Sequence, residues 1–340
     1  MIPTDKRKLI NDEQMITFFS GYDFTWRLTK ILSIKFLMAN REMLKENLNA
    51  YYKDSYNCDD QYIYNPVTNG LMFSAVSELL MQFEDFFALL KFIRSDVFFI
   101  RNITRYHASN VNEVAERLIE LADNEILAAF MIPDENYVKK ISSRQTKKVR
   151  ERSLKLYKDG TKTLIENVKQ TTEQFQKYRF FYNQYKHGLT VALRPYSGSL
   201  TEEGIQERKE GMESFIISYD NDTFEQMEKM GRLKDGLPMM LPNLTPLIQP
   251  HLTELMQEKN LLRYHAKTVN LNDIIEVSKN VCMLNMILIN NRLDFIQPSS
   301  KECNTIRLPV KGMDIPLGHM ELKLCNGGRP LGINRYRREL

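Results

Sequence analysis

Four polar side chains near the middle of the chain have the types and the spacing that phosphodiester chemistry requires. Arg179, Asn183 and His187 are four residues apart, so they would lie on one face of a helix, and Lys186 is next to His187. A histidine can exchange protons near neutral pH, while a guanidinium or ammonium group neutralises the charge that develops on a phosphate. Lys186 would also disfavour the imidazolium form of His187 and so keep the ring available as a base.

The same residues also have a structural interpretation. Gly188 follows His187, and a lysine or histidine in a last helical turn interacts well with the negative helix end, while glycine suits the position after it. An alternative catalytic cluster is Arg101, Asn102 and His107. With an RNA substrate neither cluster would need a metal, because the adjacent 2′-hydroxyl can be the nucleophile.

Basic residues are concentrated around the first of these clusters. The net charge is +4 at pH 7, but the residues from Lys139 to Arg194 include fifteen Lys or Arg and only four Asp or Glu. This asymmetry is typical of a face that binds a polyanion, although it also fits a solvated helix surface. The candidate nucleic-acid contacts are Lys147, Lys148, Arg150 and Arg152.

The composition predicts a globular, mainly α protein. The 340 residues are 43% hydrophobic, and there are only 14 Gly and 12 Pro, so the long Leu, Lys, Glu and Met stretches favour helix over sheet. The four cysteines are far apart, and neither a signal peptide nor a membrane-spanning segment is evident. We therefore expect a soluble, cytoplasmic protein with reduced thiols and no membrane contact. The isolated histidines predict no metal site, and no cofactor is expected.

The apolar pattern predicts an antiparallel helical bundle with long central helices. A helix that is apolar on most sides is expected from 74 to 101, another from 113 to 130, and a long one from 144 to 189. Apolar residues recur along the long helix at steps of three and four, so its seam can pack on 74–101 in coiled-coil fashion. A further helix is expected from 272 to 295, with Asn272 as its N-cap.

Five segments follow from this pattern. They are an N-terminal helical segment with a Tyr-rich loop (1–70), a helical core (71–195), a small irregular or β insertion or subdomain (196–270), a helix that rejoins the core (271–298) and a short β-containing C-terminal tail (299–340). The insertion contains one strand candidate at 214–219, and the tail contains two, at 305–310 and 320–324.

The helical core resembles a known superfamily. A core of antiparallel helices, of which the later ends in YNQYKHG with an asparagine four residues before the histidine, is similar to the HEPN superfamily. Its members include many ribonucleases of toxin, abortive-infection and other prokaryotic defence systems. The resemblance covers about residues 74–190 and the helix at 272–295.

The match to the family motif is partial. The motif is an arginine, often followed by a polar residue such as asparagine, and then a histidine four to six residues after the arginine. Asn183, Lys186 and His187 match the polar and histidine positions. Tyr182 stands where the spacing would place the arginine, and Arg179 lies one turn earlier.

The resemblance implies a metal-independent endoribonuclease that acts as a homodimer, with the polar stripes of two chains facing each other. His187 would transfer the proton, Arg179 and Lys186 would contact the phosphate, and Asn183 would orient the reacting groups. Two other hypotheses are a non-catalytic bundle that binds nucleic acid or a partner protein through the basic residues of 139–179, and a structural protein that dimerises along its long helix.

Overall fold

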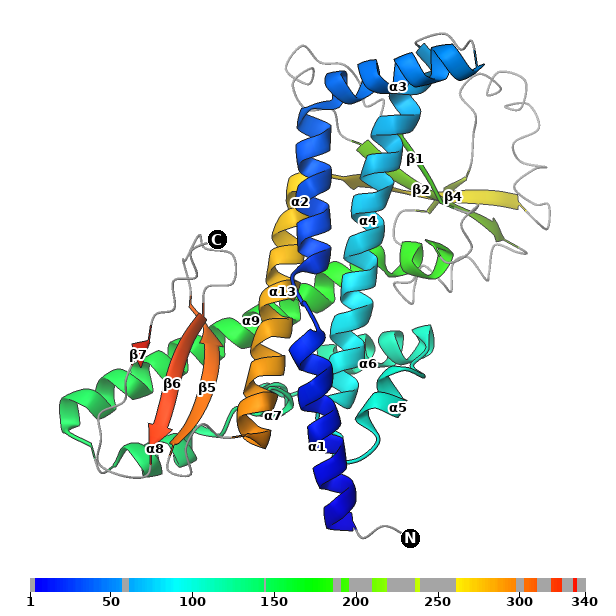
Figure 1. Cartoon of the computed structure of the whole chain (residues 1–340). Coiled ribbons are helices and arrows are strands. Elements are labelled where there is room, and N and C mark those ends of the chain that lie inside the picture. The colour runs from blue at the N-terminus through cyan, green and yellow to red at the C-terminus, as the bar shows by residue number, and fades with distance from the viewer. Residues whose placement is uncertain are drawn as a thin grey trace. The chain divides into compact units, whose positions relative to one another are not determined.

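The computed structural model describes most of the helical part of the chain and parts of its strands (Figure 1). The described residues are 4–56, 61–143, 145–185, 191–195, 210–218, 236–238, 261–297, 303–310, 319–325 and 333–334. They form two compact units. The first comprises Met1–Thr29, Met81–Gln176 and Glu276–Leu340, and the second comprises Lys30–Leu80 and Lys177–Ile275.

The described residues are mainly helical, which confirms the fold class predicted from the composition. The helices are α1 (Thr4–Gly21), α2 (Trp26–Ala39), α3 (Arg41–Tyr56), α4 (Gln61–Phe92), α5 (Phe99–Ile103), α6 (Ala108–Glu120), α7 (Asp123–Ala129), α8 (Glu135–Ser142), α9 (Lys147–Tyr185) and α13 (Leu271–Ile296). None of these helices is both long and apolar enough to cross a membrane.

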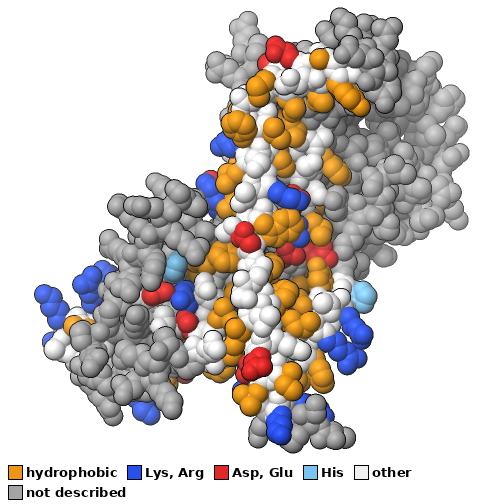
Figure 2. All heavy atoms as spheres, viewed as in Figure 1, with side chains coloured by type: hydrophobic (Ala, Val, Ile, Leu, Met, Phe, Trp, Pro, Cys, Tyr) orange, Lys and Arg blue, Asp and Glu red, His pale blue; other side chains and the backbone are white. Residues whose placement is uncertain are grey.

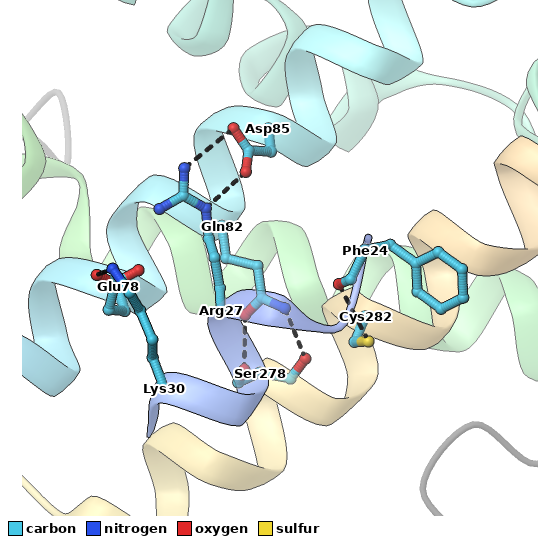
Figure 3. Close-up of polar contacts among 8 residues, drawn as sticks. All are labelled: Phe24, Arg27, Lys30, Glu78, Gln82, Asp85, Ser278 and Cys282. Carbon is cyan, nitrogen blue, oxygen red and sulfur yellow. Dashed lines mark hydrogen bonds and ion pairs between the residues drawn. The ribbon is translucent and has the colours of Figure 1, made fainter. Parts of the chain in front are cut away.

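α1 and α13 pack antiparallel in the first unit. In the middle of α1, Asp12 lies 3.8 Å from Arg292, which is close to the end of α13. Just after α1, the backbone oxygen of Phe24 accepts a hydrogen bond from the Cys282 thiol at 3.4 Å (Figure 3). Burial raises the pKa of this thiol to about 12, so Cys282 stays protonated in the folded chain.

α4, α9 and α13 meet through buried and half-buried polar groups. Gln82 of α4 donates to the backbone oxygen of Ser278 at 3.1 Å and accepts from its hydroxyl at 2.6 Å (Figure 3). Two residues further along α13, Asn280 donates to the Thr171 hydroxyl at 2.8 Å and to the backbone oxygen of Asn167 at 3.2 Å. Since an unpaired buried polar group is costly, these bonds select one register of α13 against α4 and α9.

Phe175 of α9 is the centre of an aromatic cluster in this unit. Its ring centroid lies 5.5 Å from that of Phe83 and 5.0 Å from that of Phe87, in edge-to-face geometry. All three rings are fully buried, as are Leu164 and Val168 earlier on the same face of α9. The predicted apolar seam of the long helix is therefore confirmed from Tyr157 to Tyr178, while the side chains of its later members, Tyr182, Tyr185 and Leu189, lie outside the described part of the structure.

Ion pairs join α2 to α4 within each unit. In the first unit, Nε of Arg27 lies 2.6 Å from the Asp85 carboxylate (Figure 3). In the second unit, Nζ of Lys30 lies 2.8 Å from the Glu78 carboxylate. The Arg27 pair is the more buried of the two, so solvent screens it less.

The helix expected over 74–101 is wrong at its C-terminal end, because α4 stops and the short α5 follows. Between them, Phe98 has a left-handed φ of 63°, which is unusual for a residue other than glycine. Asn11 of α1 holds this turn by donating to the backbone oxygen of Ser95 at 3.0 Å and accepting from the backbone N–H of Phe99 at 2.8 Å. The break thus depends on a side chain far away in the sequence.

Two other expected boundaries also change. The helix expected over 113–130 is divided at Ala122, whose backbone N–H donates to the Glu125 carboxylate at 3.0 Å and so caps α7. The N-cap side chain of α13 belongs to Asn270, whose Oδ1 accepts from the backbone N–H of Asn272 at 2.8 Å.

The Tyr-rich loop expected before residue 70 is largely helical, since α3 extends to Tyr56 and α4 begins at Gln61. Tyr, Asn and Asp are only weakly unfavourable in a helix, at less than about 0.7 kcal/mol per residue. A run of them is therefore weak evidence for a loop.

Two antiparallel sheets account for the predicted strands. The second unit contains β1 (Val191–Pro195), β2 (Glu210–Ser218), β3 (Gly236–Pro238) and β4 (Leu261–Val269), in the order β1-β2-β4-β3. The first unit contains β5 (Cys303–Pro309), β6 (His319–Cys325) and β7 (Ile333–Asn334), in the order β5-β6-β7. The strands expected at 305–310 and 320–324 are confirmed as β5 and β6, with both ends of each within two residues of the expected positions. The strand expected at 214–219 is confirmed as β2, although β2 begins earlier, at Glu210.

The β5–β6 hairpin packs closely against α9 at Gly160. A Cβ at this position would lie 2.6 Å from Cε of Met320 and 2.8 Å from Cβ of Leu308. The methionine end is flexible, but Cβ of Leu308 is fixed to the backbone of β5. Gly160 therefore allows a contact between helix and hairpin that a side chain would prevent.

We expect Gly160→Ala to lower the free energy of unfolding, although alanine favours a helix over glycine by about 1 kcal/mol. Overpacking costs about 1–3 kcal/mol, so after the gain in helix propensity is subtracted the net loss should be up to about 2 kcal/mol. Urea unfolding followed by circular dichroism measures it.

The matched control is Gly70→Ala, because a Cβ at this exposed position in α4 would meet nothing within 4 Å. This variant should be more stable than the wild type by up to about 1 kcal/mol. A Gly160 variant that gained as much stability as the Gly70 variant would contradict the close contact.

Candidate nucleic-acid interface

A group of exposed cationic side chains lies on two consecutive helices of the first unit. We call it the basic face, and it consists of Lys139 and Lys140 on α8 and Lys147, Lys148, Arg152 and Lys155 on α9. Figure 2 shows Lys and Arg side chains on the side of this unit where α8 and α9 lie. From residue 139 to residue 155 the sequence contains eight Lys or Arg and a single acid, Glu151.

The packing of α9 determines which of its residues face solvent. Ser153 and Tyr157 are buried on the side of the helix that continues into the apolar seam. Lys148, Arg152 and Lys155 follow each other at steps of four and three, so they form a stripe on the opposite side. Burial of one side of α9 therefore places these cations together in solvent.

A hydrogen bond from Tyr157 positions the start of α9. Its hydroxyl donates to the backbone oxygen of Pro133 at 2.6 Å, in the turn before α8. The next residue, Asp134, caps α8 by accepting from the backbone N–H of Tyr137 at 2.7 Å. Burial, aided by the nearby acids Asp134 and Glu135, raises the pKa of Tyr157 to about 12. The tyrosine thus remains a neutral donor that joins the two helices of the basic face.

One edge of the basic face is partly neutralised. Glu135 lies 2.7 Å from Nζ of Lys139 and 3.2 Å from Nζ of Lys158, and hydrogen bonds from these two ammonium groups lower the pKa of its carboxyl. The other five members, Lys140, Lys147, Lys148, Arg152 and Lys155, have no ion pair with any residue that the structure describes.

Unpaired cations at this density suit a polyanion better than a single small anion. Each lysine or arginine that neutralises a phosphate releases condensed counterions, so several such contacts together give strong binding that depends on salt. Phosphate contacts of this kind position a nucleic acid without selecting its sequence. The basic face can therefore bind a nucleic-acid backbone, and base recognition would need other groups.

Most of the predicted nucleic-acid contacts are exposed to solvent, as binding of a polyanion requires. Lys147, Lys148 and Arg152 are exposed, whereas Arg150 is half-buried and points less freely to solvent. The four predicted contacts did not include Lys155, although its spacing of three from Arg152 marks it as a member of the same stripe.

The first predicted catalytic cluster is only partly covered by the structure. Arg179 and Asn183 belong to α9, which confirms that they are one turn apart on a single helix. Lys186 and His187 lie outside the described residues.

The alternative cluster is arranged differently from the prediction. Arg101 and Asn102 belong to α5 rather than to the end of the first central helix, and His107 immediately precedes α6. Arg101 and His107 are exposed, and the Arg101 guanidinium lies 5.8 Å from the ring centroid of Phe98. Because the chain turns between Arg101 and His107, helical spacing does not describe how these residues are related.

Within the described ranges, no three His, Cys, Asp or Glu side chains are grouped so that they could hold a metal ion. Comparisons of the chain with protein-family models, with curated proteins and with solved structures found no match.

We expect Tyr157→Phe to lower the free energy of unfolding by about 1 kcal/mol near pH 7, because it removes the hydrogen bond to Pro133. In the unfolded wild type the hydroxyl ionises near its ordinary pKa of 10.0, whereas the folded value is about 12. The wild type therefore loses stability as the pH rises from 10 to 12 and the variant lacks this loss, so the difference between them should shrink in that range.

Urea unfolding at several pH values between 7 and 11 measures this difference. The control is Tyr137→Phe, whose hydroxyl is on an exposed side chain of α8 and which should change stability little. A constant difference between Tyr157→Phe and wild type across the range would contradict the assigned role of the hydroxyl.

Proposed function

We propose that this protein binds RNA through the basic face of α8 and α9. The observation that carries the proposal is the stripe of Lys148, Arg152 and Lys155, exposed and without ion pairs to described residues. The partial match of Asn183, Lys186 and His187 to the HEPN motif favours RNA over other polyanions, because many members of that superfamily act on RNA.

The biological setting follows from the same resemblance. A homodimer acting in the cytoplasm within a prokaryotic defence or toxin system is the context that HEPN-like proteins suggest. A protein partner on the basic face is the competing hypothesis, since an acidic protein surface would also complement these cations.

Neutralising the stripe tests RNA binding. We expect Lys148→Gln, Arg152→Gln and Lys155→Gln together to weaken binding to a single-stranded RNA by about tenfold or more near physiological salt. The slope of log K against log salt should fall by about 2, because each lost contact with a single strand removes about 0.7. Fluorescence anisotropy over a salt series measures both quantities.

A matched control separates this face from net charge. Lys6, Arg105 and Arg117 are exposed cations elsewhere in the first unit, and their joint replacement by Gln removes the same charge. RNA binding by this control should stay close to wild type. Equal losses in the two triple variants would show only a general charge effect and would overturn the proposed interface.

A second candidate function is RNA cleavage at the end of α9. It is supported by the course of this helix, which continues without interruption through Arg179 and Asn183 to Tyr185. In this proposal Arg179 and Lys186 contact the phosphate, Asn183 orients the reacting groups and His187 transfers the proton from the 2′-hydroxyl. The active form would be a metal-independent endoribonuclease.

We expect His187→Ala to reduce cleavage of a fluorophore-quencher RNA by about a hundredfold or more, since general acid-base catalysis contributes that much. The melting temperature and the RNA affinity should remain near their wild-type values. A variant that fails to fold would instead support a helix-capping role for His187.

His107→Ala is the control for the alternative cluster and should keep its cleavage activity. Loss of cleavage in this variant alone would move the catalytic centre to Arg101, Asn102 and His107. RNA binding without cleavage by wild-type protein, even at high protein concentration, would leave binding as the function and exclude the endoribonuclease.

A further inference from the structure

A separate cleft in the first unit is built around a buried arginine. The cleft has a volume of about 550 Å³ and is bordered by the end of α13, by β5, by the turn between α7 and α8, and by the residues that follow α4. Arg292 of α13 lines it and is only 3% exposed. A cleft of this volume is within the range of small-molecule sites, about 300–1,000 Å³.

The Arg292 guanidinium has unused hydrogen-bonding capacity. Its Nε and Nη2 have no hydrogen-bond partner among the described residues. The nearest carboxylates, those of Asp12 and Asp96, each lie 3.8 Å from Nη2, which is too far for a direct hydrogen bond. Arg292 therefore has two long ion pairs but no direct hydrogen bond from Nε or Nη2, so these buried donors can bind a closer anionic partner.

Other cations lie around the same cleft. Arg94 and Lys8 both line it and are exposed. Asp96 also lines it and lies 3.8 Å from Nζ of Lys8 as well as from Arg292, but its side chain is 65% exposed and can turn to solvent. Asp294 is already paired with Arg307, and Asp12 and Asp96 together balance only two of these three cations.

The rest of the lining is apolar and aromatic. Met131, Ile132 and Ile306 contribute aliphatic surface, and the rings of Tyr137 and Phe295 are 39% and 62% exposed. An exposed ring beside a cationic cleft can stack on a flat heterocycle. The cleft thus presents cationic, aliphatic and aromatic groups that suit a single ligand with both a charged and an apolar part.

We propose that this cleft binds a small phosphorylated molecule with a flat aromatic part, the chemistry of a mononucleotide, with its phosphate at Arg292 and Arg94. The ring of the ligand packs on Tyr137 or Phe295. Asp96 competes with the phosphate for the same cations and turns outward when the ligand binds. This site is independent of the basic face and does not require that the protein bind RNA.

Isothermal titration calorimetry with adenosine 5′-monophosphate tests the site, using adenosine and inorganic phosphate as probes of the two halves of the ligand. The monophosphate should bind most tightly, because it alone occupies both the cationic and the aromatic parts. Tighter binding of adenosine than of the monophosphate, or no binding of any probe at millimolar concentration, would overturn the proposal.

Three substitutions make the test specific. Arg292→Met should weaken monophosphate binding by about tenfold or more, because a buried charge partner is removed. Arg94→Gln should weaken it several-fold, whereas Asp96→Asn should strengthen it several-fold by removing a competing carboxylate. Arg105→Gln, an exposed cation that does not line the cleft, is the control and should leave binding unchanged.

If Arg292→Met does not fold, the variants at the exposed residues Arg94 and Asp96 still test the proposal. Arg94 and Asp96 are both on the surface, so their variants should melt close to the wild-type temperature. Opposite changes in affinity for these two variants are the result expected for an anion. Unchanged affinity in both, or weaker binding in Asp96→Asn, would contradict a phosphate at this position.

Discussion

The reciprocal hydrogen bonds between Gln82 and Ser278 are the constraint on which the first unit depends. Both side chains are buried, so a slip of α13 by one residue would rotate Ser278 away and leave two polar groups unpaired, at about 1–3 kcal/mol each. With this register, Asn280 reaches α9 and Asn291 bonds the backbone of both Phe130 and Arg307. The same register places Arg292 at the cleft.

The two cationic sites of the first unit, the basic face and Arg292, differ in their exposure to water. The charges of the basic face are solvated and screened, so they suit a long polyanion that replaces many counterions at once. Arg292 is withdrawn from water, and burial lowers the pKa of its guanidinium from the ordinary value. The affinity of a desolvated cation with unused hydrogen-bond donors depends on how well the acceptor atoms of one ligand match the positions of those donors, rather than on the number of contacts.

Much of the helical architecture could be predicted because its signals are local. Apolar residues at steps of three and four marked the seam of α9, and Phe175, Leu164 and Val168 on it are buried. The wrong boundaries have different causes. The end of α4 depends on a distant partner, because Asn11 of α1 holds the turn at Phe98. The division at Ala122 and the N-cap of α13 depend on the nearby side chains of Glu125 and Asn270, whose capping roles were not predicted.

The sequence by itself determined the fold class, the long helices and the concentration of positive charge, since composition and periodicity act over a few neighbouring residues. It also placed Lys147, Lys148 and Arg152 among the candidate contacts, because clustered charge is visible in the order of residues. Only the tertiary structure decided that Arg292 is buried beside Arg94 and Lys8. These residues come from three distant segments, and their convergence depends on how α1, α4 and α13 pack, which no local pattern encodes.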